Sequence, residues 1–359
     1  MNRCSSLCLG VVAFLPLACG NTGAPAQDYG PLLDKVTDQV ILPESQAFVT
    51  QADALVVAVQ ALSDAPEASS AEAARAAWRD ARKAFRVLDA LHFGPGYTQH
   101  ITERIDVAPS DPAGIEALAA GTTPISDSTV SAAGGRKKGF LGLEYLLFSD
   151  PGSDGPAPTV ADDDLAPRRR AVALGMAHEI AKSAHQLGDA WVPYAEQIKL
   201  AGAGGTQYAT QRAAVDDLVG GCAYALESIV GIRLAQPLGR KSGGTPDPSL
   251  DFTPRSDNAL ADMQASLSGV FAVYSGDGLS SVIRKKSAGL DDSVSTEFAS
   301  ADAALAAIPS PFAGALIDPA SLVLVKDAYT ATQALKSSWN SDVSSALGAT
   351  VLVGENDGD

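Results

Sequence analysis

The sequence has few of the residues that most often carry catalysis and metal binding. Aromatic residues make up 6% of the 359 residues, and there are only four histidines and four cysteines. Basic residues are also in the minority, since 26 Lys and Arg stand against 42 Asp and Glu, for a net charge of −16. This deficit argues against a nucleic-acid partner or an anionic membrane surface. Hydrophobic residues reach 46%, which excludes a disordered chain, and the length suits two domains.

The cysteines and histidines are placed so that the common metal and nucleophile motifs are missing. Only Cys222 lies beyond residue 19, among small and apolar neighbours, so we expect a core residue and no disulfide. None of the four histidines forms a His-Glu-x-x-His motif, and His178 and His185 are too far apart to share an ion. A phosphate-binding glycine loop and a Gly-x-Ser-x-Gly elbow are also missing from the sequence.

The N-terminus has the pattern of an export signal. Its apolar stretch, residues 7–18, is too short to span a bilayer, so we expect residues 1–18 to be a signal peptide. The stretch ends in Leu-Pro-Leu-Ala-Cys, which resembles a bacterial lipoprotein cleavage box, although Pro16 occupies a place usually held by a branched aliphatic residue. We expect Cys19 to be lipidated and residues 19–27 to form a tether. An ordinary signal cleaved nearby is the alternative.

The rest of the chain predicts an all-α protein of two helical-bundle halves. Apolar residues recur at the helical period, and no long alternating run predicts a strand. The expected helices are 29–62, 72–92, 138–148, 168–200, 207–234, 258–274, 291–308 and 319–347. The Asp-, Pro- and Gly-rich stretch 151–166 is the expected linker between a domain of 28–150 and one of 167–359, with 237–255 as the alternative border. A faint repeat suggests that the halves arose by duplication.

Glu144 and Asp89 are carboxylates in apolar surroundings. Glu144 is the only charged residue from Gly139 to Phe148, so we expect it to be buried and to need a partner, a metal or a proton. A bond to a backbone amide or to an arginine is the structural alternative. Asp89 lies on the same helical face as Trp78, and an ion pair with Arg82 would explain it equally well.

Two further candidates lie in loops. Asp106 precedes Ala108 and Pro109, where an aspartate commonly serves in a turn. His100 is close to this acidic segment and is a weak candidate ligand.

Several segments together resemble the imelysin-like family of bacterial envelope proteins, which includes the insulin-cleaving membrane protease and iron-regulated proteins. The first is a helix from Trp78 that ends in an acidic residue and Phe-Gly-Pro, and the second is similar to the family's Arg-Ile-Asp-x-Trp-Pro. The third looks like its Gly-x-His-x-x-Glu helix, and the ends of the chains are also alike. These segments are residues 78–95, 104–112, 138–148, 347–348 and 356–359.

The resemblance implies an exported, often lipid-anchored protein of two helical bundles that is linked to iron or haem acquisition. The family was first classed as metallopeptidases, and its Gly-x-His-x-x-Glu was taken as a metal site. Here Leu141 stands where the family has histidine, while Glu144 is kept. Asp89 replaces a glutamate, and Ala108 replaces the tryptophan. A remaining cluster of Glu144, Asp89 and Asp106 would favour Ca²⁺ or Fe³⁺ over zinc.

Three functional hypotheses follow. The first is a lipid-anchored envelope protein, facing the periplasm or the cell surface, that binds a divalent or ferric cation, an iron-bearing ligand or an envelope protein partner without catalysis. Its binding residues would be Glu144, Asp89, Asp106 and His100, and its only membrane contact would be the lipid on Cys19. The second is a metallopeptidase-like hydrolase, which the loss of histidine at Leu141 disfavours. The third is a degenerate scaffold without a metal site.

Overall fold

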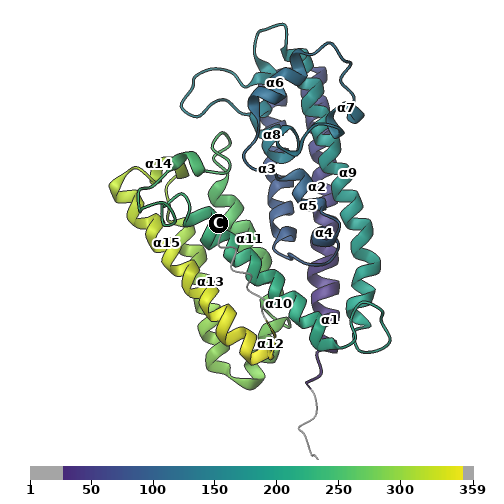
Figure 1. Ribbon diagram of the computed structural model, residues 1–359, viewed down its shortest axis with the longest axis vertical. Coiled ribbons are helices and arrows are strands. Elements are labelled where there is room, and N and C mark those ends of the chain that lie inside the picture. The colour runs from purple at the N-terminus through teal and green to yellow at the C-terminus, as the bar shows by residue number, and fades with distance from the viewer. Residues whose placement is uncertain (1–26, 351–359) are drawn as a thin grey trace, which may run out of the picture.

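The computed structural model describes residues 27–350, and within this range the chain forms helices and loops with no strand (Figure 1). The predicted all-α fold is therefore confirmed. The α-helices are α1 Gly30–Val36, α2 Leu42–Asp64, α3 Ala68–Asp89, α4 Gly94–Thr98, α5 Ile101–Ile105, α6 Pro112–Ala120, α7 Asp127–Ser131, α8 Gly139–Leu147, α9 Ala166–Lys199, α10 Gln211–Glu227, α11 Ala259–Tyr274, α12 Leu279–Lys286, α13 Ala288–Ala306, α14 Phe312–Ala315, α15 Pro319–Ser338 and α16 Ser344–Leu347. π-helical turns extend three of them, η1 Thr37–Ile41, η4 Ser228–Leu234 and η6 Trp339–Val343, and short 3₁₀ turns are η2 Gly135–Lys137, η3 Pro158–Val160 and η5 Pro248–Leu250.

The first bundle is formed by the long helices α2, α3 and α9, with α8 packed against α3 and α9. Its core is aromatic where α3 meets α8. The ring of Phe85 stacks on that of Phe140 with centroids 5.4 Å apart, and the indole N–H of Trp78 donates to the carbonyl oxygen of Phe140 at 3.0 Å. Trp78 and Phe85 are both buried, as the periodicity of this helix predicts.

The second bundle contains α10, α11, α13 and α15 (Figure 1). Tyr274, Phe298 and Trp339 pack against one another in its core. The indole N–H of Trp339 donates to the carbonyl oxygen of Val219 at 3.0 Å, which fixes the end of α15 to α10. Cys222 is buried in this bundle, as expected, and burial raises the pKa of its thiol.

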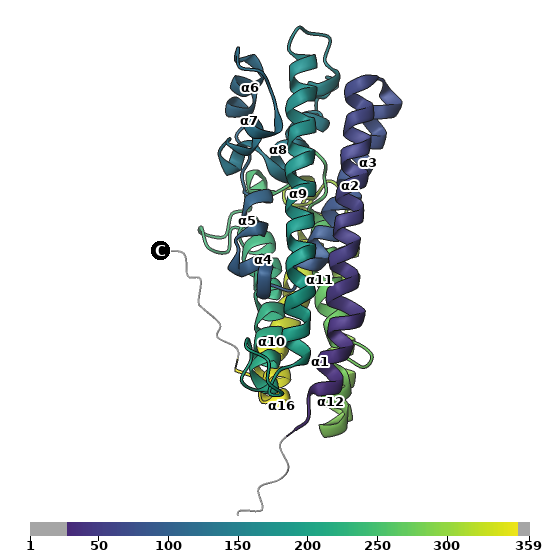
Figure 2. The same ribbon diagram turned by 90° about the vertical axis from the view of Figure 1, so that its right-hand side faces the viewer.

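The two bundles meet where α3 packs along α11 (Figures 1 and 2). Gly269 allows this close approach, because a Cβ atom there would lie 2.3 Å from the carbonyl oxygen of Val87 and 2.7 Å from the Cβ of Ala90. The contact brings side chains of α3 within reach of groups from the second half of the chain.

The border between the halves lies later in the chain than the predicted linker. Helix α9 packs along α2 over much of its length, so residues 166–199 belong with the first bundle. The reason is the apolar face of α9, which buries side chains such as Met176 and Trp191. The stretch 151–166 is itself anchored, because the hydroxyl of Thr159 donates to the carbonyl oxygen of Leu146 at 2.9 Å. The proposed duplication stays a prediction.

Within residues 27–350, no helix combines the length and apolar character needed to cross a membrane. The expected signal peptide, Cys19 and most of the tether lie outside the described residues, as does the acidic C-terminal segment 356–359.

Candidate functional site at the junction of the bundles

A buried group of charged side chains lies where α3 meets α11. We call Arg82, Arg86, Asp106, Arg233 and Asp262 the junction cluster. Arg82 and Arg86 come from α3, Asp106 directly follows α5, Arg233 belongs to η4, and Asp262 lies on α11. Both bundles therefore contribute charges to one site.

Arg82 and Asp262 form the centre of the junction cluster, and both are 0% exposed. The Arg82 Nε atom lies 3.0 Å from Asp262 Oδ1, and its Nη2 atom lies 2.6 Å from Asp262 Oδ2. The amide of Asn258 donates to Asp262 Oδ1 at 2.8 Å. Burial alone would lower the pKa of Arg82, but Asp106 and Asp262 outweigh it and raise the pKa above the usual value.

Asp106 bridges two arginines of α3. Its Oδ1 atom lies 2.8 Å from Arg82 Nη1, and its Oδ2 atom lies 3.2 Å from Arg86 Nη1. Burial would raise the pKa of Asp106, but the guanidinium groups of Arg82, Arg86 and Arg233 lower it to about 2. Asp106 is therefore ionised at neutral pH, and both its oxygens are engaged.

A glycine on α8 makes room for the chain that leads to Asp106. Gly139 adopts a φ of +71°, and a Cβ atom there would lie 2.4 Å from the carbonyl oxygen of Ile105. Only glycine accepts both the left-handed backbone and this close approach.

Arg233 is held more loosely than Arg82. Its Nη1 atom lies 3.5 Å from Asp262 Oδ2, and its Nη2 atom lies 4.0 Å from Asp106 Oδ2. The guanidinium lies over the ring of Phe252, 4.9 Å from the centroid. Burial, and then the charge of Arg86, lower the pKa of Arg233 to about 10, so it stays charged at neutral pH.

Glu144 is buried beside the junction cluster, with 3% of its surface exposed. Its Oε1 atom accepts hydrogen bonds from the backbone N–H of Ser256 at 2.9 Å and from the Ser256 hydroxyl at 2.7 Å. Burial raises the pKa of Glu144 to about 7, despite these two bonds. Of the structural alternatives, the backbone amide is the one that the structure shows.

The other sequence-predicted ligands lie apart from Glu144. Asp89 pairs with Arg86, at 2.9 Å, and not with Arg82 as the sequence suggested. His100 is at the surface, with its side chain 76% exposed and its Nδ1 atom 3.6 Å from Glu103. Asp89 and Asp106 thus meet at Arg86, whereas Glu144 bonds to Ser256 and His100 lies beside Glu103. Across the described part of the chain, no group of three or more His, Cys, Asp or Glu side chains is arranged to hold a metal ion.

Residues 41–339 match the family model for imelysin. The chain belongs to the imelysin family. Iron-regulated protein A of Synechococcus elongatus is 30% identical over 342 residues, which cover 91% of this chain and 88% of that protein.

Two crystal structures share the fold of this imelysin-family chain. One, described as an iron-regulated protein A precursor from Parabacteroides distasonis, superposes with a TM-score of 0.74 at 19% identity, covering 88% of this chain and 97% of that one. The other, an imelysin-like protein from Psychrobacter arcticum, has a TM-score of 0.74 at 18% identity, with 90% and 96% covered.

Four residues of this imelysin-family site were not predicted from the sequence: Asp262, Arg233, Arg86 and Ser256. Two of them had a readable signal. Asp262 is the only charged residue of α11, and Arg233 is the only one between Ser228 and Gly239. Both satisfy the criterion that singled out Glu144, a lone charge in an apolar helix.

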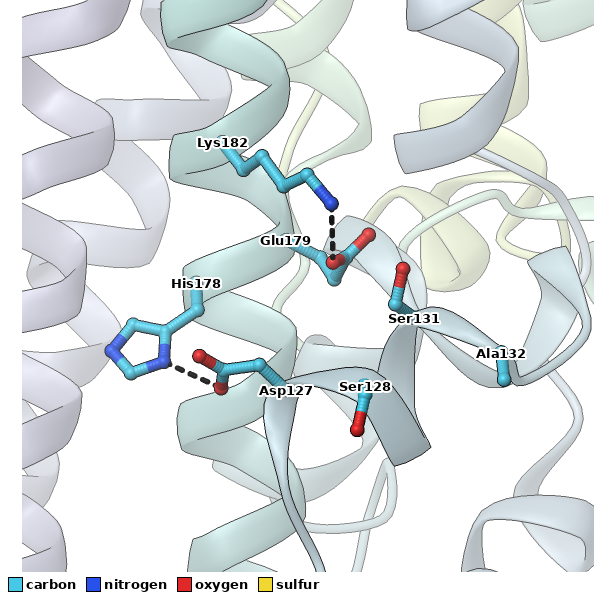
Figure 3. A pocket seen from close by; sticks show the side chains of 7 residues that line it. All are labelled: Asp127, Ser128, Ser131, Ala132, His178, Glu179 and Lys182. Carbon is cyan, nitrogen blue, oxygen red and sulfur yellow. Dashed lines mark hydrogen bonds and ion pairs between the residues drawn. The ribbon is translucent and has the colours of Figure 1, made fainter.

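A second candidate is a surface pocket of about 580 Å³ between α7 and α9 (Figure 3). His178 Nδ1 lies 2.7 Å from Asp127 Oδ1, and Lys182 Nζ lies 3.6 Å from Glu179 Oε1. The other imidazole nitrogen of His178 points away from the pocket's serines, so the arrangement is not that of a serine nucleophile with its base. The lining residues are Asp127, Ser128, Ser131, Ala132, His178, Glu179 and Lys182.

Proposed function

We propose that this protein is an exported, lipid-anchored envelope protein that acts in iron acquisition by binding an iron-bearing ligand, without catalysis, at the junction cluster. The iron connection is supported by the relatives, which carry the name iron-regulated protein A. Lipid anchoring through Cys19 is supported by the signal pattern in the sequence.

The observation that carries the proposal is the junction cluster itself. It places three guanidinium and two carboxylate groups in the contact between two bundles, at the large desolvation cost of buried charges. The Asp106 side chain keeps 12% of its surface exposed, so the cluster reaches solvent at this residue. Ligand sites occur preferentially at contacts between domains, and titratable groups with shifted pKa values gather at functional sites.

A bare iron ion does not fit these residues. The carboxylates of Asp106 and Asp262 are bound to arginines, and Glu144 accepts hydrogen bonds from Ser256 and has a pKa raised to about 7. A cation would have to displace guanidinium groups from these carboxylates and would be repelled by their positive charge. Iron inside an anionic complex meets no such repulsion, so we expect the ligand to be a ferric chelate.

The residues around Glu144 favour ligand binding over hydrolysis. A metal-dependent peptidase needs a metal that activates water, and Leu141 is a buried apolar residue where the family's histidine would supply a ligand. Glu144 faces Ser256 instead of a second ligand.

Titration calorimetry tests the proposal with ferric citrate, Ca²⁺, Zn²⁺ and haem as ligands. We expect ferric citrate to bind with one-to-one stoichiometry, and Asp106→Asn to tighten it severalfold, because the variant frees Arg86 and Arg233 from a competing carboxylate. A bare cation would respond in the opposite direction. Asp127→Asn, in the α7–α9 pocket, is the control and should change nothing. If no ligand binds, or if Asp106→Asn leaves the affinities unchanged, the proposal fails, and a scaffold that contacts an envelope protein becomes the better hypothesis.

Fractionation of cells tests the anchor separately. We expect the wild-type protein in the membrane fraction and Cys19→Ser in the soluble fraction, with Cys222→Ser as the cysteine control. A Cys19→Ser protein that stays in the membrane fraction would contradict lipid anchoring.

A further inference from the structure

Among the residues that the structure describes, two arginines of the junction cluster have buried donor groups without an acceptor. Arg86 is 4% exposed and Arg233 is 6% exposed. Within residues 27–350, the Nε atom of each is buried and has no hydrogen-bond partner. A buried donor left without an acceptor destabilises the fold, and more so when the group is charged, so the fold carries an energetic penalty at two adjacent sites.

The lack of a hydrogen-bond acceptor at Nε distinguishes Arg86 and Arg233 from Arg82. Arg82 is equally buried, yet its Nε atom bonds to Asp262 at 2.9 Å and its two other nitrogens bond to Asp262 and Asp106. Burial in this junction is therefore compatible with a fully bonded guanidinium. Arg86 and Arg233 differ because they share acceptors that are already in use.

The two guanidinium groups are neighbours around one oxygen. Asp106 Oδ2 lies 3.2 Å from Arg86 Nη1 and 4.0 Å from Arg233 Nη2. After burial, the charge of Arg86 is the largest cause that lowers the pKa of Arg233, which reflects the repulsion between them. Each guanidinium has one further carboxylate, Asp89 at Arg86 and Asp262 at Arg233, but these pairs also form at Nη atoms and leave both Nε atoms without an acceptor among the described residues. Asp106, which is 12% exposed, is also where this part of the cluster meets solvent.

We propose that Arg86 and Arg233 form an oxyanion subsite that binds a carboxylate or phosphate group of a small ligand at the junction of the bundles. A guanidinium presents its N–H groups as a planar fork, which matches the paired oxygens of these anions. The bound group supplies the acceptors that both Nε atoms lack and separates the two positive charges. The inference rests on the proposed function in that the oxyanion is the part of the iron-bearing ligand that the protein recognises, but the subsite also binds iron-free anions.

Calorimetric titrations of the purified protein with inorganic phosphate, citrate and acetate, all without iron, test the subsite. We expect at least one of these anions to bind, and Arg86→Met and Arg233→Met each to weaken it about tenfold or more. Arg233→Lys keeps the charge but loses the fork, so its loss should be smaller but measurable. If a methionine variant fails to fold, Arg233→Lys still tests the subsite.

Arg255→Met is the matched control. Arg255 also crosses the junction, lies over an aromatic ring (4.6 Å from the Tyr145 centroid) and pairs with a carboxylate, that of Asp150. Its substitution removes the same charge and a similar ring contact, so anion binding should stay at the wild-type level.

The outcomes separate this inference from the proposed function. The inference is overturned if none of the three anions binds, or if both methionine variants and Arg233→Lys bind them as tightly as the wild type. Ferric citrate that binds equally to all variants would reject the subsite and the junction cluster as the binding site, and would leave standing only that the protein binds an iron-bearing ligand. Citrate that binds through Arg86 and Arg233, with no preference for its ferric complex, would support the subsite and reject the iron-binding function.

Discussion

Asp106 and Glu144 are two buried carboxylates of one junction in opposite electrostatic surroundings. Burial by itself would raise the pKa of both carboxyl groups. At Asp106, three guanidinium groups outweigh the effect of burial and lower the pKa to about 2. At Glu144, the two hydrogen bonds from Ser256 are too weak to outweigh burial, and the pKa rises to about 7. Charged partners therefore decide the ionisation state of these two carboxyl groups, and neutral hydrogen-bond donors do not replace them.

The difference divides the site into a permanently ionised part and a part that titrates near neutral pH. Asp106, whose pKa is lowered to about 2, stays an anion far below neutral pH. Glu144 gains or loses its proton in the physiological range.

Removing the central arginine should have the largest effect. We expect Arg82→Met to lower the free energy of unfolding by about 3–5 kcal/mol, because it leaves Asp262 and Asp106 buried without their main partner. Urea denaturation followed by circular dichroism measures the loss.

Two further variants show whether the loss comes from unpaired charge. Arg79→Met on the same helix removes an arginine that is 41% exposed, so it should cost at most about 1 kcal/mol. The double variant Arg82→Met with Asp262→Asn should recover part of the stability, since it removes the stranded carboxylate as well. A double variant that is less stable than Arg82→Met alone would contradict this explanation.

Neutralising Glu144 should change how stability depends on pH. A carboxyl group whose pKa rises from 4.5 to about 7 on folding binds its proton more tightly in the folded state. Its contribution is therefore fully present below pH 4.5 and is lost as the pH rises from there through about 7, which amounts to about 3 kcal/mol.

We expect Glu144→Gln to be close to the wild type at pH 5 and more stable by about 2 kcal/mol at pH 8, because the glutamine oxygen still accepts from Ser256 and carries no charge. Urea denaturation of both proteins at the two pH values measures the difference. Asp251, whose pKa burial raises to about 6, is present in both proteins and cancels. A stability difference that is the same at pH 5 and pH 8 would show that Glu144 does not titrate in this range.

The same comparison shows what the sequence can and cannot predict. Helical periodicity predicts the long helices, and the lone charge of an apolar helix predicts that Glu144 is buried. The partner of each buried charge was not predictable, because pairing depends on how two helices pack. Arg82 looked like the partner of Asp89 on its own helix, yet it bonds to Asp262 in the other half of the chain. The border between the bundles was misplaced for a similar reason, since composition marks the loop before α9 but not the helix against which α9 packs.

The smallest effect should come from Asp89, the carboxylate at the solvent edge of the same arginines. Its side chain is 20% exposed and pairs with Arg86 at 2.9 Å, whereas that of Asp106 is 12% exposed and contacts both Arg82 and Arg86. We expect Asp89→Asn to lower the free energy of unfolding by about 0.5–1 kcal/mol, and Asp106→Asn by about 2 kcal/mol or more.

High salt should separate the effects of Asp89→Asn and Asp106→Asn further, because ions screen exposed ion pairs far more than buried ones. In 1 M NaCl the cost of Asp89→Asn should nearly vanish, while that of Asp106→Asn should persist; urea denaturation at low and high salt measures both. Equal costs for the two variants, with equal sensitivity to salt, would mean that Asp106 is as hydrated as Asp89. In that case solvent, and not the three arginines, would set its ionisation, and the contrast with Glu144 would reduce to a difference in burial.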